Sequence, residues 1–417
     1  MLNVASELLE PLIKYLRAIK EVNRVEVAGS FRRGQETVGD IDILVSSSQP
    51  LKVVRHFTAY EHVSEVRAQG STRASVVLRQ GLPVDLRIVG DLSFGAAMHY
   101  FTGSKAHNIA LRTLARERQL KMNEYGVFSG TERLAGATEA SVFHALGLSY
   151  IEPELRENRG EIAAARAGRL PLLIERSDLR GDLHTHTKST DGRNSLREMA
   201  LAAQQRGLAY LGITDHSQRW ALRHGLDPDS LSRQIDEIDK LNAELDGITL
   251  LKGIEVEIKE DGDLDLPDSI LSRLDLVVAA VHSQFTLSRE RQTGRILRAM
   301  DHRYFTLLAH PTGRLLLERE PYDIDMLRII GHAKQRGCSL ELNAQPRRLD
   351  LSANYCMLAK DEGVLISINS DAHSIYDLDD LRFGVQQARR GWLEKNDVLN
   401  TMSIGHLKAQ LSKMQGN

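Results

Sequence analysis

The sequence predicts two folded parts, an α+β unit over residues 1–150 and a parallel α/β barrel over residues 178–417, joined by a connector at 151–177. In the first part, strand-like and helix-like segments mix without regular alternation. From Leu179 onward, short apolar strands alternate with helices, which is typical of parallel sheets. Most strands of the second part also end in a histidine or a carboxylate, and the C-terminal ends of barrel strands are where such folds place their active sites.

The overall composition is that of a soluble globular protein with more than one domain, since 417 residues are 42% hydrophobic and 26% charged. The formal net charge of −2 gives no indication of a polyanionic partner. Cys338 and Cys356 cannot build a disulfide framework, which fits a reducing compartment. Glu7, Glu10 and Lys14 interrupt the first apolar stretch, and no run approaches the ~20 apolar residues of a membrane span. We therefore expect a cytoplasmic protein without membrane contact.

Periodicity defines the elements expected in the first part. The segments VEVAG and DIDILVS read as strands, joined by a loop that carries glycine and arginine, and a hairpin is expected around Gly81. The predicted order is an amphipathic helix at 3–20, strands at 25–29 and 40–46, a helix at 51–60, the hairpin, a helix at 106–118 and a strand-and-turn region to about 150. The connector holds one helix, in ENRGEIAAARAG.

Helix and strand signals alternate through the second part. Ser195 is a good N-cap for SLREMALAAQQRG, and Gly207 stands at the C′ position of that helix. Further helices are predicted at 230–245, 324–336, 354–362 and 379–392. Seven apolar strands are predicted near 180–186, 209–216, 249–258, 274–283, 305–310, 338–344 and 364–371. This alternation favours a parallel barrel.

Candidate metal ligands lie at or just after the ends of these strands. They are His184, His186, Asp191, His216, Glu255, His282, His310, Asp371 and His373. His184 and His186 alternate on one strand, so both imidazoles point to the same face. Nitrogen and oxygen ligands without sulfur suit Zn²⁺, Mn²⁺ or Fe²⁺, and this set exceeds the needs of one ion, so we expect two or three. Adjacent ions of this kind bind phosphate esters and generate hydroxide near neutral pH.

For some of these residues a second interpretation stays open. A lone histidine in an apolar strand is more often a satisfied core residue than a ligand, although the shared position at strand ends favours a metal site for the set. Asp215, beside His216, either orients a ligand or caps a turn. Arg314 and Arg347 either bind a phosphate or are surface charges.

A second group of carboxylates lies in the first part. Alternation puts Asp40 and Asp42 on one face of a strand, where both can hold Mg²⁺, and Asp85 on a neighbouring strand is placed to complete a two-metal site. Gly29–Ser30 lets the backbone approach phosphates closely, and Arg33 supplies a positive charge for them. Two Mg²⁺ ions would activate a 3′-hydroxyl and stabilise leaving pyrophosphate. The alternative is that the first two aspartates are solubility charges on an edge strand.

The motifs H-x-H, T-D-H, G-I-E, V-H-S, A-H-P and D-A-H occur in this order over about 178–400 and resemble the PHP (polymerase and histidinol phosphatase) phosphoesterase domain. Every ligand position of that family's pattern is filled here. The resemblance implies a distorted (β/α)7 barrel, a trinuclear site that holds Mn²⁺ or Zn²⁺, and hydrolysis of phosphoesters.

The segment GSFRRG followed by GDIDIL closely resembles the palm of family X DNA polymerases, the DNA polymerase beta type. YFTGS at 100–104 resembles the segment that packs on the incoming sugar, and MNEYGVF at 122–128 resembles the thumb. The resemblance implies that Asp40, Asp42 and Asp85 are catalytic Mg²⁺ ligands. The nucleotide-binding residues that it implies are Gly29, Ser30, Arg33, Gly39, Tyr100, Phe101, Gly103, Asn108 and Arg112. Without the family, the two aromatic residues read as core residues.

The order of palm, thumb, connector and PHP domain is that of bacterial and archaeal family X polymerases, but two features depart from that family. Its members begin with a lyase domain and a fingers region whose helix-hairpin-helix turns need glycine. The first glycine here is Gly29, already in the palm-like segment, so we expect both regions to be missing and DNA affinity to be weakened. Pro83 stands two residues before Asp85, where the beta-type enzyme has an arginine.

These patterns predict a monomeric DNA repair enzyme that combines nucleotidyl transfer from deoxynucleoside triphosphates with 3′-5′ exonuclease activity on gapped or 3′-end DNA substrates. One alternative is a PHP nuclease or small-molecule phosphatase whose polymerase half is inactive. Another is a non-catalytic DNA-end binder with structural metals, which the absence of cysteine from the ligand set disfavours.

Overall fold

The computed structural model describes residues 1–218 and 225–416, and the chain divides into two compact units, Met1–Pro171 and Leu172–Asn417. The first unit is α+β and the second is a parallel α/β barrel, as predicted. The helix expected in the connector is α7 (Glu161–Arg166), which belongs to the first unit. None of the helices in the described ranges has the length and hydropathy that crossing a bilayer requires.

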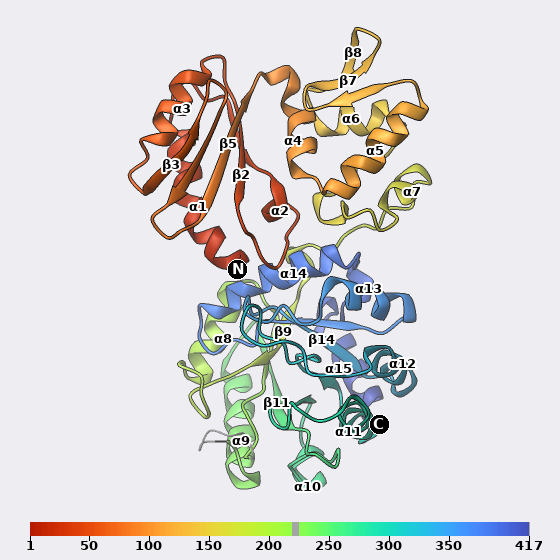
Figure 1. Ribbon diagram of the computed structural model, residues 1–417. Helices are drawn as coiled ribbons and strands as arrows, with labels where there is room; N and C mark the ends of the chain where they lie inside the picture. Colours follow the sequence, from red (N-terminus) through yellow and green to blue (C-terminus); the bar gives the residue numbers. More distant parts are fainter. Residues whose placement is uncertain (219–224, 417) are drawn as a thin grey trace. The chain divides into compact units, whose positions relative to one another are not determined.

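Within residues 1–171, a five-stranded sheet has the strand order β1-β2-β5-β4-β3. The strands are β1 (Arg24–Val27), β2 (Ile41–Ser46), β3 (Val63–Gln69), β4 (Arg73–Leu78) and β5 (Pro83–Val89). Strands β2 and β5 are parallel, and the other neighbours are antiparallel. Helices α1 (Leu2–Arg17) and α3 (Pro50–Thr58) pack their apolar stripes on one face of this sheet, around Leu12, Leu16 and Phe57 (Figure 1).

The connection between β1 and β2 differs from the predicted loop because it contains the one-turn helix α2 (Gly29–Arg32). Gly29 has a φ of +66°, which turns the chain from the strand directly into this helical turn. The backbone N–H of Arg33 donates to the carbonyl of Gly29 at 3.3 Å and closes the turn. A single turn is too short to produce a helical period in the sequence, so periodicity did not detect it.

The rest of the first unit covers the other face of the sheet and extends from it. It comprises helices α4 (Phe94–Thr102), α5 (Lys105–Glu117), α6 (Glu139–Ala145) and α7, and the strands β6 (Lys121–Asn123), β7 (Gly126–Ser129) and β8 (Glu132–Ala135). Helix α4 packs through Phe94, Ala97 and Met98 against Leu44 of β2. This packing brings the end of α4 close to α2 and to the start of β2, where the predicted nucleotide pocket lies.

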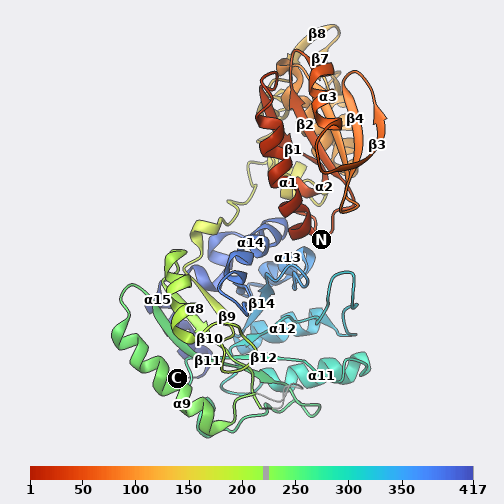
Figure 2. The same ribbon diagram turned by 90° about the vertical axis from the view of Figure 1, so that its left-hand side faces the viewer.

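Within the described part of the second unit, seven parallel strands follow the order β15-β14-β13-β12-β11-β10-β9. They are β9 (Gly181–Thr185), β10 (Tyr210–Ile213), β11 (Thr249–Glu257), β12 (Leu276–Ala280), β13 (Leu307–Leu308), β14 (Ser339–Asn343) and β15 (Ile366–Asn369). Helices surround them (Figure 2): α8 (Leu196–Gln205), α9 (Pro228–Glu244), α10 (Asp268–Leu271), α11 (Arg289–Met300), α12 (Met326–Arg336), α13 (Ala353–Glu362), α14 (Leu381–Arg390) and α15 (Ile404–Met414). The seven predicted strands and the predicted helices are confirmed, whereas α10, the charge-rich α11 and α15 were not predicted.

The barrel nearly closes between its first and last strands. The backbone N–H of His186 donates to Ala372 O at 2.8 Å just beyond the ends of β9 and β15. Further from these strand ends, a side chain links β9 to β15 in place of backbone hydrogen bonds. The Asn400 amide donates to Gly181 O at 2.8 Å and to Ile368 O at 2.6 Å. This distorted closure draws the ends of β9 and β15 together, and both carry predicted metal ligands.

Candidate active sites

The nine predicted metal ligands of the second unit gather at the C-terminal rim of the barrel. Three groups have ligand atoms close enough to share an ion: His186, Asp191, His216 and His373; His184, His186 and Asp371; and His216, Glu255 and His282. His310 joins them because its Nε2 lies 3.0 Å from Glu255 Oε1. Six different strands deliver these residues, which is why no single motif contains the site.

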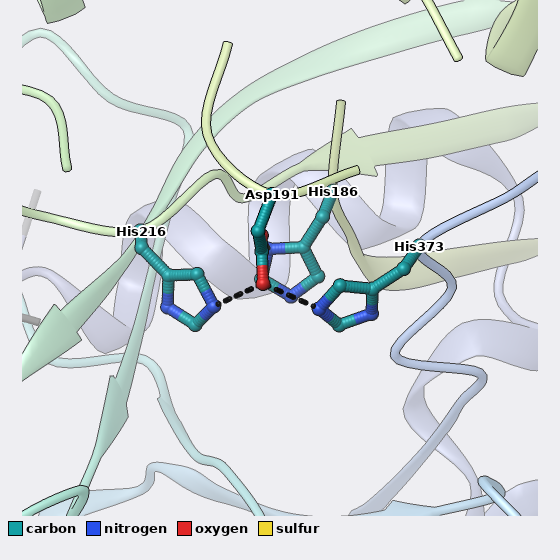
Figure 3. A group of neighbouring side chains, drawn as sticks. All are labelled: His186, Asp191, His216 and His373. Atoms are coloured by element: carbon teal, nitrogen blue, oxygen red, sulfur yellow. Dashed lines mark hydrogen bonds and ion pairs between the residues drawn. The ribbon is translucent and has the colours of Figure 1, made fainter. Parts of the chain in front are cut away.

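Asp191 is the carboxylate of the first group (Figure 3). Its Oδ2 lies 3.0 Å from His373 Nε2 and 3.5 Å from His216 Nε2. The His186 ring stacks between the rings of these two histidines, with centroid distances of 4.4 Å to His216 and 4.3 Å to His373. Asp191 comes from the turn after β9, so the turn folds back over the histidines of its own strand.

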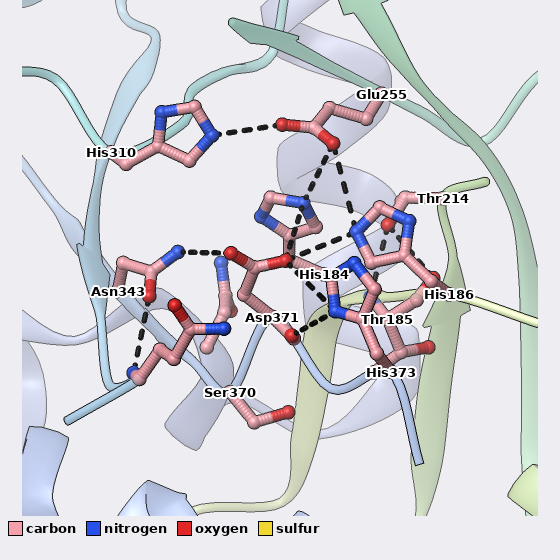
Figure 4. Close-up of polar contacts among 12 residues, drawn as sticks. His184, Thr185, His186, Thr214, Glu255, His310, Asn343, Ser370, Asp371 and His373 are labelled. Atoms are coloured by element: carbon pink, nitrogen blue, oxygen red, sulfur yellow. Dashed lines mark hydrogen bonds and ion pairs between the residues drawn. The ribbon is translucent and has the colours of Figure 1, made fainter. Parts of the chain in front are cut away.

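Glu255 and Asp371 are the carboxylates of the deeper groups (Figure 4). Asp371 Oδ1 lies 3.1 Å from His186 Nε2 and 3.7 Å from His184 Nε2. Glu255, on β11, is 1% exposed, and it lies 2.9 Å from His216 Nδ1 and 3.2 Å from His282 Nε2. One buried carboxylate therefore faces histidines from several strands, an arrangement that suits bridging of adjacent cations.

The donor set fits metal ions. His184 Nε2 and Glu255 Oε2 are buried and lie 3.4 Å apart, yet neither has a hydrogen-bond partner among the described residues. Unsatisfied buried donors and acceptors are costly unless another group fills the gap between them. Imidazole nitrogen and carboxylate oxygen are the ligands that Zn²⁺ and Mn²⁺ accept.

Charge balance within the site shifts the pKa values of its members. Burial alone would raise the pKa of Glu255, but the nearby His216, His184 and His282 hold it well below its usual value. Burial alone would lower the pKa of His282, but Glu255 and Glu257 raise it to about 9. Since a metal binds neutral imidazole, binding an ion here releases protons.

Sequence reasoning missed two buried carboxylates that orient the histidines. Glu341 on β14 lies 2.7 Å from His184 Nδ1 and accepts from the backbone N–H of His310 at 2.7 Å. Glu257 lies 2.9 Å from His282 Nδ1 and accepts from Ser283 Oγ at 2.6 Å. Carboxylates of this kind fix the ring orientation of a ligating histidine. The sequence signal for each was a glutamate inside an otherwise apolar strand. Glu341 lies in the segment LELN, and Glu257 lies in the segment IEVE.

The two open roles of Asp215 are resolved in favour of a supporting one. It accepts from Thr187 N at 2.8 Å, from Thr190 Oγ1 at 2.6 Å and from Gln234 Nε2 at 2.6 Å. These bonds hold the 187–190 turn that precedes Asp191. The contacts of Asp215 therefore favour the interpretation in which it orients a candidate ligand by holding the turn before Asp191.

The two arginines considered for phosphate binding are occupied elsewhere. Arg347 is exposed, and its Nε donates to Glu318 Oε1 at 3.1 Å. Arg314 donates to the carbonyl oxygens of Arg348, at 3.0 Å, and of Leu349. Arg348, the residue after Arg347, lies with its Nε 3.4 Å from Asp371 Oδ2, and sequence reasoning did not single it out.

The first unit holds a pocket of about 430 Å³ whose lining includes most of the predicted nucleotide-binding residues. The lining residues are Gly29, Ser30, Arg33, Asp40, Asp42, Tyr100, Phe101, Thr102, Gly103, Lys105, Asn108 and Arg112. Asp85 and Gly39 lie with Asp40 in an adjacent hollow. Asp42 and Asp85 are register partners on the parallel strands β2 and β5, so their side chains project from the same face.

Gly29 is required by its contact with Asp42. A Cβ on Gly29 would lie 2.3 Å from Asp42 Oδ2, and the φ of +66° is one that other residues rarely adopt. The close approach encloses the Asp42 carboxylate. Burial, followed by repulsion from Asp40 and Asp85, raises the pKa of Asp42 to about 6. Clustered carboxylates of this kind are relieved by binding cations.

The phosphate-side residues make contacts within the unit. Arg33 donates through Nε to Glu157 Oε1 at 3.0 Å and through NH1 to Thr102 O at 2.5 Å. Asn108 Nδ2 donates to Tyr100 O at 2.7 Å. Tyr100 is 37% exposed and Phe101 is half-buried, so neither is a fully buried core aromatic.

A buried ionic network that sequence reasoning missed anchors α2. Arg32 donates to Glu139 at 2.9 and 2.6 Å and to Thr102 Oγ1 at 2.7 Å. Fully buried Arg156 donates to the same glutamate at 2.7 Å. The network joins α2, α4 and α6 and so holds the Gly29–Ser30 turn over the aspartates.

These two sites define a protein class that joins a polymerase-type palm to a metallo-phosphoesterase barrel, and comparison with known proteins agrees. The chain matches the DNA polymerase beta palm over residues 5–83, the DNA polymerase beta thumb over 97–157 and the PHP domain over 182–370. The chain is 39% identical over 416 residues to the DNA polymerase/3′-5′ exonuclease PolX of Bacillus subtilis (strain 168). This alignment covers 99% of the present chain and 72% of the B. subtilis protein. The chain belongs to the PolX family.

Other relatives share the second unit. Two of them are named as probable phosphatases. The one from Thermoanaerobacter sp. (strain X514) is 30% identical over 243 residues. The one from Caldanaerobacter subterraneus is 29% identical over 245 residues. Each alignment covers 56% of this chain, and 94% and 91% of those two proteins. The barrel is thus also similar to proteins that consist of little else.

Proposed function

We propose that this chain is a DNA-processing enzyme with two sites: the first unit adds deoxynucleotides to a primer, and the second removes nucleotides from 3′ ends. The observation that carries the proposal is the gathering of nine candidate nitrogen and oxygen ligands, Glu255 among them, at one rim of the barrel in a chain that also carries three clustered aspartates. Similarity to PolX of B. subtilis, named as both a DNA polymerase and a 3′-5′ exonuclease, supports the pairing.

In this proposal the domain limits are 1–150 for palm and thumb, 151–177 for the connector and 178–417 for the PHP domain. The division of the compact units between Pro171 and Leu172, inside that connector, supports these limits. We also propose that the enzyme acts on gapped DNA in repair, as a monomer in the cytoplasm. The absence of a membrane-spanning helix from the described residues agrees with this.

At the metal centre, the nine ligands would hold two or three Mn²⁺ or Zn²⁺ ions, which supply a hydroxide nucleophile and stabilise the leaving oxygen. The protein's own part is to fix the ligands. Glu341 and Glu257 orient His184 and His282 through their Nδ1 atoms, and Asp215 holds the turn before Asp191. Because these contacts are buried, little reorganisation is needed when substrate binds.

In the first unit, Asp40, Asp42 and Asp85 would hold Mg²⁺, which activates the primer 3′-hydroxyl and neutralises the triphosphate. The α2 backbone and Arg33 would contact phosphate oxygens, and the exposed ring of Tyr100 would pack on the sugar. Asn108 and Arg112 line the same pocket and would contact the nucleotide or the template. Gly39 lines the adjacent hollow together with Asp40 and Asp85.

The test uses a gapped DNA with a labelled primer, incubated with Mg²⁺ or Mn²⁺ and with or without nucleotides. We expect extension that Asp40→Ala abolishes, and 3′ shortening that His184→Ala abolishes. The matched controls are Glu61→Ala and His406→Ala, which remove an exposed acid of the first unit and an exposed histidine of the second. Failure of the wild-type protein to shorten DNA would disprove the exonuclease, and shortening that survives His184→Ala would disprove its assignment to this site.

A second function, hydrolysis of small phosphoesters, is favoured by the similarity of the barrel to the probable phosphatases. The same preparation is therefore assayed with phosphorylated amino alcohols. Turnover of these compounds at least as fast as that of DNA ends would favour the phosphatase.

A further inference from the structure

Arg348 places a positive charge beside the metal ligands. Its Nε lies 3.4 Å from Asp371 Oδ2, and its side chain is 18% exposed, so the guanidinium reaches from the barrel rim to solvent. Nε is buried and has no hydrogen-bond partner among the described residues. The guanidinium thus lies beside a candidate ligand delivered by β15.

The surrounding chain holds this arginine in place while its neighbours face elsewhere. Arg314 donates to the carbonyl oxygens of Arg348 and Leu349, and this fastens the backbone that directly follows the Arg348 side chain. Arg347 instead pairs with exposed Glu318. The segment after β14 therefore presents two adjacent arginines, one toward the metal ligands and one toward solvent.

The carboxylate of Asp371 has hydrogen-bond partners other than Arg348. Its Oδ1 faces His186 at 3.1 Å, and its Oδ2 accepts from Asn343 Nδ2 at 3.1 Å. The Arg348 contact adds no hydrogen bond to these. A guanidinium whose Nε has no hydrogen-bond partner among the described residues, at the rim of a carboxylate-rich site, is suited to an anionic ligand, and its fork matches the oxygens of a phosphate.

We propose that Arg348 is a catalytic residue of the exonuclease site that binds a non-bridging oxygen of the scissile phosphodiester at a DNA 3′ end. This rests on the proposed function. In the hydrolysis, the oxygen of water bonds to phosphorus, the P–O3′ bond breaks, and the released 3′-oxygen takes up a proton. Negative charge on the phosphoryl oxygens increases during this displacement, and Arg348 stabilises it.

The test compares Arg348→Ala with Arg347→Ala, the matched control, and with Arg348→Lys, all in the full chain. Removing one charge-stabilising donor costs roughly 100-fold, so we expect kcat/KM for shortening of a labelled 3′ end to fall by about this factor in Arg348→Ala. We expect Arg348→Lys to retain part of the activity, and added guanidinium ions to restore part of the activity of Arg348→Ala. The activity of Arg347→Ala should stay within about twofold of the wild type.

Two readouts separate phosphate binding from a structural role. Inorganic phosphate is titrated against the Mn²⁺-loaded proteins, and bound Mn²⁺ is counted. We expect about tenfold weaker phosphate binding in Arg348→Ala with an unchanged Mn²⁺ content. Loss of Mn²⁺ with unchanged phosphate affinity would show that Arg348 only positions Asp371, and equal behaviour of the two alanine variants would also overturn the proposal. Arg348-dependent phosphate binding without DNA shortening in the wild type would reject the exonuclease and keep the phosphate site.

Discussion

The two central carboxylates of the candidate metal site are more deeply buried than the three aspartates of the first unit. Glu255 is 1% exposed and Asp371 is 4% exposed, whereas Asp40 is exposed and Asp42 and Asp85 are half-buried. In the second unit each carboxylate already faces histidines, and further buried carboxylates orient those rings. In the first unit the aspartates face one another across two strands and repel.

The difference indicates how each site acquires its metals. A buried set of mixed ligands pairs its own charges and binds ions before any substrate arrives. Half-exposed carboxylates that repel one another hold Mg²⁺ weakly until a triphosphate adds its own oxygens, which is the usual way that Mg²⁺ binds in nucleotide sites. We therefore regard the metal centre as preassembled and the palm pocket as assembled by its substrate.

The strongest test of the difference between the two sites is to remove Glu255, the central carboxylate of the second unit. We expect Glu255→Ala to lower the rate of 3′ shortening by about 1,000-fold, because it strips ligands from adjacent ions, and to leave nucleotide addition unchanged. Glu260→Ala, an exposed glutamate close by on the same barrel face, is the control. Primer shortening and extension are measured on the same gel, and parallel loss of both activities would contradict the separation of the sites.

The corresponding test in the first unit is Gly29→Ala. The added methyl group meets Asp42 Oδ2 at 2.3 Å, so we expect nucleotide addition to fall by about 100-fold while 3′ shortening is unaffected. Gly81→Ala is matched in backbone conformation, with a φ of +82° and nothing within 4 Å of the new Cβ. A similar loss in both variants would mean that backbone strain, and not the contact with Asp42, is responsible.

Orientation of ligands is tested by Glu341→Gln. The substitution keeps the size of the side chain but weakens the contact with His184 Nδ1, and we expect Mn²⁺ affinity to fall by roughly 10- to 100-fold. Equilibrium dialysis measures the affinity, with exposed Glu362→Gln as the control. An unchanged affinity would show that the ring of His184 is held by packing alone.

The smallest expected effect is a dependence on pH in the first unit. Asp42 has a pKa raised to about 6, so its carboxyl is protonated below that pH and has to lose a proton before it binds Mg²⁺. Apparent Mg²⁺ affinity in nucleotide addition should therefore fall by about tenfold between pH 6 and pH 5. Saturating Mg²⁺ restores the rate if this is correct, and a profile that stays flat down to pH 4 would contradict it.

The fold and the clustering of the candidate metal ligands could be predicted because their signals are local. Strand alternation and helix caps depend on neighbouring residues, and the Ser195 cap bears this out by accepting from the Glu198 N–H. A ligand at a strand end is visible in its own strand. The one-turn α2 has no period, and periodicity therefore described it as a loop.

Residues that act through distant partners could not be predicted in this way. Glu341 contacts His184 across 157 positions of the chain, and Arg33 meets Glu157 across 124. Arg348 and Arg347 are adjacent and chemically identical, so only the fold distinguishes the one near Asp371 from the one paired with Glu318. Packing, not local pattern, assigns these roles.

The most direct test of the difference between the sites is a count of bound Mn²⁺ by electron paramagnetic resonance, with and without a nucleotide that cannot be incorporated. Without nucleotide, we expect the wild-type protein to bind two to three Mn²⁺ ions tightly. Glu255→Gln should lose this tight binding, whereas Asp42→Asn should keep it. Nucleotide should add a weaker class of ions that Asp42→Asn removes. If Asp42→Asn removes the tight ions, or if Glu255→Gln leaves them in place, the metal centre of the second unit is not the preassembled site.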